Sequence, residues 1–490
     1  MKSEKNSFKI HSIKYNLLMN IILKISAFIF PLITFPYVSR VLGAGPNGKI
    51  SFAASVISYF SLLAGMGIPS YGIRKCAEIR DDKDKLSKTV QELLLINSFF
   101  TICSYLVLII TIVVIPKFRQ DSLLFYITSI TIVFNTLGID WFYQAIEQYD
   151  YITIRNIFFK VIAIILMLLF IHKPSDYILY AGISVFGNVG SNILNMLRVR
   201  KYISFKRYPS YSFQPHIKPI FMLFLYNATT TIFTNLDQVM LGFMSTSKEV
   251  GYYAATVKIK NILTSLITAL GSVMLPRVAY YLKKGNSERF VVLIKQSFNF
   301  IIIVAIPISV YFILESKAII LFLAGEGYER ASMIMQWIAP SIIFIGLSSV
   351  TAWQILIPMK KEKVTVIGAV VGAVINVIVN VLCIPKFGGV GAAIGTGLAE
   401  LGVFLTHCIA LREKIKQWID LKEVLLGICV SLISAGILVI FNSVINLNAS
   451  YFFECLATAF LFFVSYGLLL LVFKEPIVNN TVKNFFSRIK

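Results

Sequence analysis

Long apolar runs recur along almost the whole chain, and they constrain its fold more than any other feature. A window of about 19 residues, the length used to find membrane helices, gives fourteen such runs, joined by loops too short to hold a soluble domain. Lipid offers no hydrogen-bond partner to exposed backbone groups, so each run should form a helix. We therefore predict an all-α polytopic membrane protein with fourteen transmembrane helices. The predicted centres are Ser26, Ile57, Ser104, Val133, Met167, Phe186, Thr230, Ser265, Ala305, Ile343, Ala373, Leu401, Leu432 and Leu461.

The basic residues predict how these spans are oriented. The chain has 46 Lys and Arg, and with the N-terminus inside, 31 of them fall in inner segments and 9 in outer loops. This asymmetry follows the positive-inside rule, so both termini are predicted to be cytoplasmic. It also explains most of the net charge of +22 without a nucleic-acid partner. The six cysteines show no CxxC spacing, which predicts neither disulfides nor a metal site.

A faint internal repeat divides the predicted spans into two pseudo-symmetric sets of six. SFAASVIS (51–58) and YYAATVKI (252–259) share AASV/AATV, six helices apart. An even number of helices per repeat gives parallel repeats. The linker between them is basic and contains aromatic residues, so it either lies on the membrane surface or is a plain charged connection. The predicted parts are an N-terminal lobe at 1–200, a cytoplasmic linker at 201–218, a C-terminal lobe at 219–413, and two extra spans with a cytoplasmic tail at 414–490.

Polar residues interrupt the seventh span, NATTTIFTNLDQVMLGFM (227–244). Hydroxyl and amide side chains commonly pack membrane helices together, which is one interpretation. An acid within a span usually faces a partner or a wet cavity, so Asp237 favours a functional site. Helical spacing places on one face Asn227, Thr231, Thr234 and Gln238, flanked by Thr230 and Asp237.

Other polar side chains are predicted at a depth similar to that of Asp237. Asn376 and Asn380 share a face as an i, i+4 pair, and Thr396 and Glu400 lie on the next span. Hard cations take oxygen ligands. The sequence therefore predicts either a Na⁺ site at Asp237, Asn376, Asn380 and Thr396, or a proton carried by Asp237 or Glu400. No other cofactor is expected.

Basic residues inside spans predict a site for an anionic substrate. Lys24 lies at mid-depth on the first span, too central to reach the headgroups cheaply. Lys258 lies at about the depth of Asp237 on the neighbouring span. Phosphate is the obvious anion, because Lys binds it as a point charge.

Three further basic residues are candidates for the same site, and each keeps a plainer alternative. Lys160 could pair with Asp140 as part of the structure. Lys260 points about 200° away from Lys258 around the helix. Arg277 lies near the inner end of its span, where its side chain could extend to the cytoplasmic headgroups.

Four long stretches carry a family resemblance: RVLGAGPNGKISFAASVISYFSLLAGMGIPSYGIRKCAEIRDD (40–82), GIDWFYQAIEQYDYITIRN (138–156), TNLDQVMLG (234–242) and VGYYAATVKI (250–259). The chain resembles the Wzx-type oligosaccharide flippases of the multidrug/oligosaccharidyl-lipid/polysaccharide exporter superfamily. The resemblance implies two six-helix lobes around a central cavity, with two added helices. It also implies flipping of undecaprenyl-diphosphate-linked repeat units across the bacterial plasma membrane, for capsule or O-antigen-type polysaccharides. Implied partners are membrane lipids and glycan polymerase machinery, with the protein working as a monomer.

Related flippases of peptidoglycan precursor place a basic residue where Lys258 stands. They place a cation site where Asp237, Asn376, Asn380 and Thr396 stand. This sequence departs from that pattern, because Asn380 replaces an expected acid and the first span carries one lysine in place of several arginines. Sodium and proton coupling therefore both stay open.

Two other functions remain as alternatives. A drug/cation antiporter of the same superfamily would prefer an acidic cavity. A membrane glycan polymerase would need a sizeable external loop or a carboxylate cluster at the surface. The chain has no G-x-x-x-x-G-K-[ST] nucleotide motif, so we expect a transporter that is not an enzyme, working by ion-driven alternating access.

Overall fold

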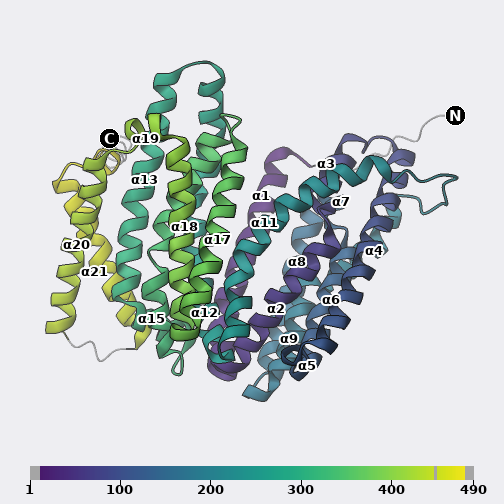
Figure 1. Ribbon diagram of the computed structural model, residues 1–490, viewed down its shortest axis with the longest axis horizontal. Coiled ribbons are helices and arrows are strands. Elements are labelled where there is room, and N and C mark those ends of the chain that lie inside the picture. Colours follow the sequence, from purple (N-terminus) through teal and green to yellow (C-terminus); the bar gives the residue numbers. More distant parts are fainter. Residues whose placement is uncertain (1–10, 446–449, 480–490) are drawn as a thin grey trace. The chain divides into compact units, whose positions relative to one another are not determined.

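The computed structural model describes residues 11–445 and 450–479, and within these ranges the chain forms helices and no strands (Figure 1). The predicted cytoplasmic ends at 1–10 and 480–490 lie outside these ranges. Thirteen of the described helical segments are long and apolar enough to cross a membrane. The predicted seventh span is also a helix, but its polar residues keep it below the hydropathy of the others. The all-α, multi-pass membrane fold is confirmed, whereas the count of fourteen spans and the orientation of the termini stay predictions.

The chain packs into two compact units, residues 1–239 and 240–490. Their boundary falls inside α11 (Gln214–Met244), close to its C-terminal end. Most of α11 belongs with unit 1 because it packs there closely: a Cβ on Gly67 would lie 2.5 Å from the Ile220 carbonyl oxygen. The predicted division into lobes at 1–200 and 219–413, separated by the linker 201–218, stays a prediction.

Unit 1 is built from helices that follow one another through short turns. Met66 (φ 45°) and Gly67 (φ 77°) both take left-handed backbone, and this reversal ends one helix and starts the next. The elements are α1 (Ile13–Leu42), α2 (Ala44–Gly65), α3 (Ile68–Glu78), α4 (Lys83–Val114), α5 (Pro116–Gln120), α6 (Ser122–Gly138), α7 (Asp140–Ala145), α8 (Tyr149–Phe170), η1 (Pro174–Asp176), α9 (Tyr177–Val185), the π-helical η2 (Phe186–Gly190), α10 (Asn192–Arg198), η3 (Val199–Lys201) and α11.

A buried aromatic core joins α3 and α7 at one end of unit 1. Trp141, Phe142 and Tyr143 of α7 pack there with Tyr71 of α3. Gly72 makes the approach possible, because the Trp141 ring occupies the place where a Cβ would stand. The stretch that the family resemblance singles out at 138–156 therefore forms much of this core.

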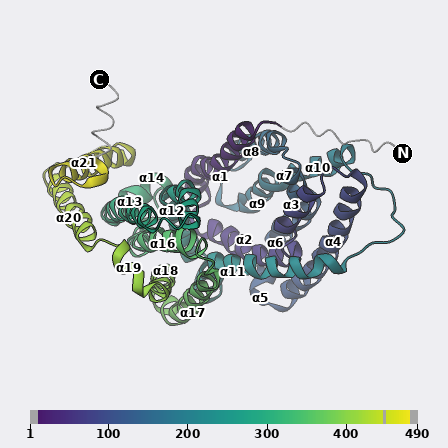
Figure 2. The same ribbon diagram turned by 90° about the horizontal axis from the view of Figure 1, so that it is seen from above.

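Unit 2 also consists of helices in its described part. Its C-terminal pair, α20 and α21, lie side by side next to α13 (Figures 1 and 2). The elements are α12 (Ser247–Lys283), α13 (Ser287–Leu314), α14 (Ser316–Ala324), α15 (Glu329–Ile338), α16 (Ser341–Ser349), the π-helical η4 (Val350–Leu356), α17 (Glu362–Phe387), α18 (Gly389–Ala410), α19 (Arg412–Trp418), α20 (Leu421–Val444) and α21 (Tyr451–Val472).

The tightest helix contact in unit 2 is between α17 and α18. Gly391 of α18 faces the backbone of Cys383 and Ile384, and a Cβ there would lie 2.5 Å from the Cys383 carbonyl carbon. Gly395 follows four residues later and faces the side chain of Asn380. Small residues spaced by four let membrane helices approach closely, which explains the glycine-rich sequence of this span.

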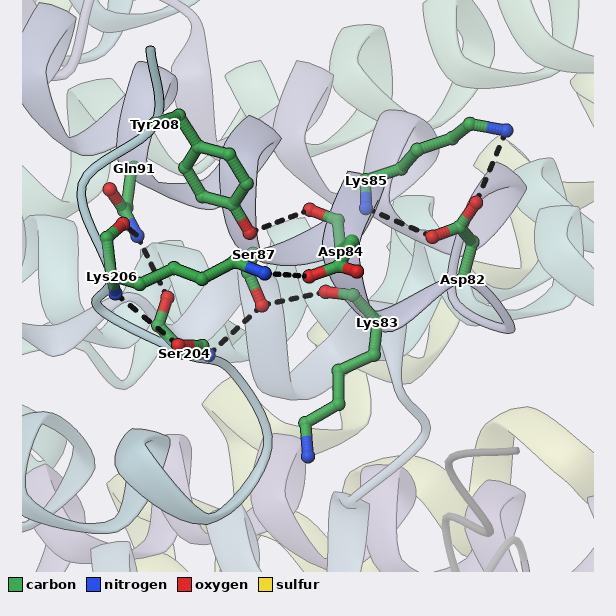
Figure 3. A network of polar contacts seen from close by, with 9 residues as sticks. All are labelled: Asp82, Lys83, Asp84, Lys85, Ser87, Gln91, Ser204, Lys206 and Tyr208. Carbon is green, nitrogen blue, oxygen red and sulfur yellow. Dashed lines mark hydrogen bonds and ion pairs between the residues drawn. The ribbon is translucent and has the colours of Figure 1, made fainter. Parts of the chain in front are cut away.

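The segment before α11 is docked on α4 and does not hang free. We call residues 202–213 the strap. Gln91 donates its amide hydrogens to the backbone carbonyls of Ser204 (2.8 Å) and Lys206 (3.2 Å), and the Ser204 N–H donates to the Ser87 hydroxyl (2.9 Å). Lys206 also pairs with Asp84 at 2.6 Å (Figure 3). Lys206 and the backbone of the strap therefore bind to polar groups on the first turns of α4.

A second set of buried bonds fixes the end of the strap. His216 bridges the Tyr71 hydroxyl (2.8 Å) and the Glu92 carboxylate (3.0 Å) through its two ring nitrogens, and all three side chains are buried. The other Glu92 oxygen accepts the Ser212 N–H at 2.7 Å. These bonds anchor the start of α11 to α3 and α4.

Candidate functional site

Unit 1 contains a cavity of about 770 Å³ between α2, α6, α9, η2 and α11. This volume lies within the range of about 300–1,000 Å³ that small-molecule sites occupy. None of the described residues that line it carries a charge. Its polar lining from helices other than α11 includes Ser58, Ser61, Thr128, Thr131, Asn135 and Asn188.

Part of the polar face predicted for the seventh span lines this cavity. From the predicted face, Asn227, Thr230 and Thr231 of α11 are lining residues, and Asn235, which was not assigned to that face, lines the cavity as well. The Asn235 amide donates to the Thr231 carbonyl at 3.0 Å, a bond within the helix. A donor satisfied within its own helix can border open space without a partner from another helix. On this side of α11 the polar residues border a cavity and are not confined to helix packing.

Sequence reasoning missed the polar residues that the other helices contribute to this lining, among them the amides Asn135 on α6 and Asn188 on η2. Both side chains are exposed. Asn188 lies in a π-helical turn, and such turns are frequent at functional sites. The signal available in the sequence was an amide inside an apolar run, alone in the case of Asn135 and one of three asparagines in the span of Asn188.

The cavity offers hydroxyl and amide groups, each able to donate and to accept hydrogen bonds. A ligand with many neutral hydroxyl groups, such as a sugar, matches that inventory. A cationic ligand would find no carboxylate among the described lining residues, and an anionic one would find no basic group.

The predicted basic residues of unit 1 lie outside this lining. Lys24 is exposed on α1. Lys160 of α8 is half-buried, and its ammonium donates to the Ser26 hydroxyl of α1 at 3.3 Å. Asp140, the alternative partner of Lys160, pairs instead with Arg155 at 2.8 Å. The two lysines therefore lie on neighbouring helices, and Ser26 connects those helices two residues after Lys24.

Asp237 lies on α11 with only 6% of its surface exposed. The Tyr59 hydroxyl of α2 is within electrostatic reach of its carboxylate. The next residue, Gln238, accepts a hydrogen bond from the Ser55 hydroxyl at 2.7 Å. This end of α11 is therefore tied to α2 by polar groups.

The predicted basic residues of unit 2 are spread along α12. Lys258 is exposed and Lys260 is half-buried. Arg277 lies 19 residues beyond Lys258, which is about 28 Å along a helix. It lines a separate pocket of about 460 Å³ with Arg289 of α13. Unit 2 does not bring Lys258 and Arg277 into one site.

The predicted oxygen ligands of unit 2 gather where α17 meets α18. Asn376 and Asn380 are buried, and the side-chain amide of Asn380 donates to the side-chain oxygen Oδ1 of Asn376 at 3.0 Å. The buried Thr396 hydroxyl lies 2.8 Å from the Tyr253 hydroxyl of α12, and Glu400 is 9% exposed one turn further along α18. Sequence reasoning missed Tyr253, although it lies in the distinctive stretch VGYYAATVKI.

These neutral oxygens have the chemistry that a hard cation prefers. The side-chain oxygen of Asn376 already accepts a hydrogen bond from Asn380, and the Thr396 hydroxyl already shares one with Tyr253. Within the described ranges, no group of three or more His, Cys, Asp and Glu side chains could hold a metal ion. An ion here would depend on amide and hydroxyl ligands together with at most one or two carboxylates.

Comparison with known sequences matches two family models. The one described as polysaccharide biosynthesis protein covers residues 13–282, and the one described as MatE covers residues 223–382. A putative O-antigen transporter of Escherichia coli (strain K12) is 22% identical over 72% of this chain and 85% of its own length. One from Shigella dysenteriae is 22% identical over 72% of this chain and 88% of its own length.

Comparison with solved structures shows the fold. The lipid II flippase MurJ, in an inward closed conformation, superposes with a TM-score of 0.74 and 16% identity, covering 94% of this chain and all of its own. An inward-facing multidrug resistance MATE transporter of the MOP superfamily gives a TM-score of 0.56 and 15% identity, covering 81% of this chain and 99% of its own.

Proposed function

The chain belongs to the polysaccharide biosynthesis protein family, and we propose that it flips undecaprenyl-diphosphate-linked oligosaccharides from the cytoplasmic to the outer leaflet of the bacterial inner membrane. It is a multi-pass membrane transporter and not an enzyme. The observation that carries the proposal is the cavity of unit 1, whose hydroxyl and amide lining suits an uncharged glycan. The two relatives are named O-antigen transporters, which supports an O-antigen-type or capsule-type repeat unit as the cargo.

The diphosphate needs positive charge, which the cavity lining does not offer. We assign its attraction to Lys24 and Lys258, with Lys160, Lys260 and Arg277 as further contributors along its path. Lys attracts phosphate as a point charge and does not need a fixed geometry. The sugar would enter the cavity while the diphosphate follows these cations. The cargo is then passed to glycan polymerase machinery, and the transporter works as a monomer.

In this proposal an ion gradient supplies the energy, and transport proceeds by alternating access. Either Na⁺ is held by Asp237, Asn376, Asn380 and Thr396, or a proton is carried by Asp237 or Glu400. Asp237 takes part in the Na⁺ version and is one of the two candidates in the proton version, and its burial makes a change of charge there consequential.

The test is transport by the purified full-length protein in liposomes. An undecaprenyl-diphosphate oligosaccharide is placed on one side, and its accessibility to an external glycosidase is followed while Na⁺ and pH gradients are imposed separately. We expect the wild type to flip the lipid and Lys258→Ala to lose transport at unchanged protein level. Asp237→Asn should remove the response to Na⁺, or the response to pH if Asp237 and not Glu400 carries the proton.

Each outcome has a distinct meaning. A wild type that leaves the lipid unflipped under both gradients contradicts the proposed function. Full activity of Lys258→Ala removes that residue from the mechanism. If neither gradient matters and Asp237→Asn still flips the lipid, Asp237 belongs to the packing of α11 and α2.

A second candidate function is a multidrug or cation antiporter, because the MatE family model matches residues 223–382. A cationic drug would require carboxylates, and the described lining of the cavity holds none. Drug susceptibility of a deletion strain separates the two functions, since only an antiporter should raise resistance to cationic drugs.

A further inference from the structure

A second hollow in unit 1 lies beside the polar cavity and has the opposite chemistry. It is a groove of about 340 Å³ between α4 and α11, and all its described lining residues are apolar. We call it the apolar groove. Four of its lining side chains are Phe99 and Phe100 of α4, Phe213 at the end of the strap and Phe221 of α11.

The apolar groove and the polar cavity meet at the turn between α2 and α3. Met66 lines the groove, while its neighbours Gly65 and Gly67 line the cavity. Gly67 packs against the backbone of α11, where a Cβ would lie 2.5 Å from the Ile220 carbonyl oxygen. The two hollows are therefore neighbours across a single turn of backbone.

The helix α11 connects the two hollows in sequence. Ile217, Ile220 and Phe221 line the groove, and Tyr226 and Asn227 are the first residues of α11 that line the cavity. Phe221 and Tyr226 are five residues apart, which is about 7.5 Å along a helix. One amphipathic molecule could thus lie along α11 with its apolar part against the first residues and its polar part against the later ones.

We propose that the apolar groove binds the polyprenyl chain of the lipid-linked saccharide, close to its diphosphate. This inference rests on the proposed function and adds to it a second contact with the substrate. The position of the groove next to the sugar-sized cavity selects this occupant over an ordinary membrane lipid, whose headgroup would be too small to use that cavity. The groove holds only the first isoprene units, and the rest of the chain extends into the bilayer.

Photolabelling tests the groove without requiring transport. The wild-type protein in phospholipid vesicles is irradiated with an undecaprenyl-diphosphate trisaccharide that carries a diazirine near the diphosphate. We expect labelled peptides from residues 95–100 and 213–221, with labelling reduced about tenfold by excess unlabelled undecaprenyl-diphosphate trisaccharide. A diazirine-bearing phosphatidylethanolamine should label these peptides weakly, and unlabelled phospholipid should not compete.

A pair of variants on one helix links this site to affinity. Leu95→Trp fills the groove from a side chain that is 49% exposed, so the fold should tolerate it. Ile110→Trp places the same ring on α4 outside the groove, at a side chain 61% exposed. Leu95→Trp should raise the lipid concentration needed for half-maximal labelling about tenfold, whereas Ile110→Trp should leave it unchanged.

The outcomes separate this proposal from the proposed function. Equal labelling by the phospholipid probe, or no difference between Leu95→Trp and Ile110→Trp, overturns the groove as a polyprenyl site even if the wild type flips the lipid. Specific labelling by a wild type that fails to flip the lipid supports the groove and contradicts the flippase function alone.

Discussion

Two pairs of asparagines inside apolar helices, one pair from each unit, are used in opposite ways. In unit 1, Asn135 and Asn188 are exposed to a cavity of about 770 Å³. In unit 2, Asn376 and Asn380 are buried and bonded to each other at 3.0 Å. A polar side chain in a membrane helix can therefore be available to a ligand or committed to its neighbours. Its burial and its partners distinguish the two cases, and its residue type does not.

The spacing of the helices produces this difference. Gly391 and Gly395 bring α18 against α17, and in that contact an amide must find a protein partner. The π-helical turn of unit 1 instead leaves Asn188 on a cavity wall. We therefore expect substitutions in the α17–α18 contact to change stability as well as any ion coupling there, and substitutions in the cavity to change transport without changing stability.

The largest effect should come from Gly391→Leu. A Cβ there would lie 2.5 Å from the backbone of Cys383, which cannot move without separating the two helices. Overpacking of this kind costs typically about 1–3 kcal/mol and sometimes more. The recovery of monodisperse protein in detergent and its midpoint of thermal unfolding measure the effect.

The matched control is Gly436→Leu on α20, where a Cβ would meet no atom within 4 Å. It should leave recovery and midpoint unchanged. If both leucine variants unfold at the wild-type temperature, the close contact of α17 and α18 does not hold unit 2 together.

A smaller loss of stability should follow Asn380→Ala. The substitution removes the amide that donates a hydrogen bond to the side-chain oxygen of the buried Asn376. A buried polar group that loses its partner lowers the free energy of unfolding by about 1–3 kcal/mol. Asn135→Ala in the cavity should change stability by less than about 0.5 kcal/mol, because its side chain is exposed. Denaturant unfolding in detergent compares the two variants, and equal values would break the contrast between the units.

Substitutions of the cavity amides should change transport and leave stability unchanged. The double variant Asn135→Ala/Asn188→Ala removes two amides from the cavity, each worth about 0.5–1.5 kcal/mol as a hydrogen bond to ligand. The concentration of lipid-linked oligosaccharide at half-maximal flipping should rise about tenfold, while the unfolding midpoint stays at the wild-type value. Initial rates in the glycosidase assay measure this. Unchanged kinetics would exclude these two amides from sugar binding.

Much of the fold could be predicted from the sequence. Apolar length locates membrane helices because lipid allows the backbone few other structures, and thirteen described segments meet that criterion. The seventh span was predicted as a helix despite its polar face, and α11 is a helix. The docking of the strap was not predicted, because it depends on Gln91 and Glu92, which contact it across more than 100 residues of sequence.

The site was harder to predict than the fold. Charged residues in spans attract attention because of their cost, so sequence reasoning selected Lys24, Lys258 and Asp237. The cavity is instead lined by neutral residues such as Asn135 and Asn188, which cost little and stand out less. The i, i+4 spacing could place Asn376 and Asn380 on one face of a helix, but it does not predict that their side chains bond to each other.

The smallest effect on stability is expected at the strap. It provides a control within unit 1, because its polar groups are hydrogen-bonded to protein neighbours, as those of α17 and α18 are. Lys206→Ala removes an exposed ion pair, which contributes little to stability. Gln91→Ala removes the donor to two strap carbonyls and the acceptor of the Tyr211 hydroxyl. Trypsin cleavage after the exposed Arg207 requires local opening of the strap. Cleavage should therefore accelerate clearly in Gln91→Ala and hardly at all in Lys206→Ala.

The pH dependence of this cleavage follows from the same contact. The hydrogen bond to Asp84 raises the pKa of Lys206 above its usual 10.5. A raised pKa stabilises the folded state fully below the ordinary value and loses that contribution as pH rises through the folded value. Near neutral pH the wild type should thus show a flat cleavage rate, and only strongly alkaline buffer should make it resemble Lys206→Ala. If Lys206→Ala opens the strap at neutral pH as fully as Gln91→Ala does, the charge of Lys206 and not the amide of Gln91 holds the strap on α4.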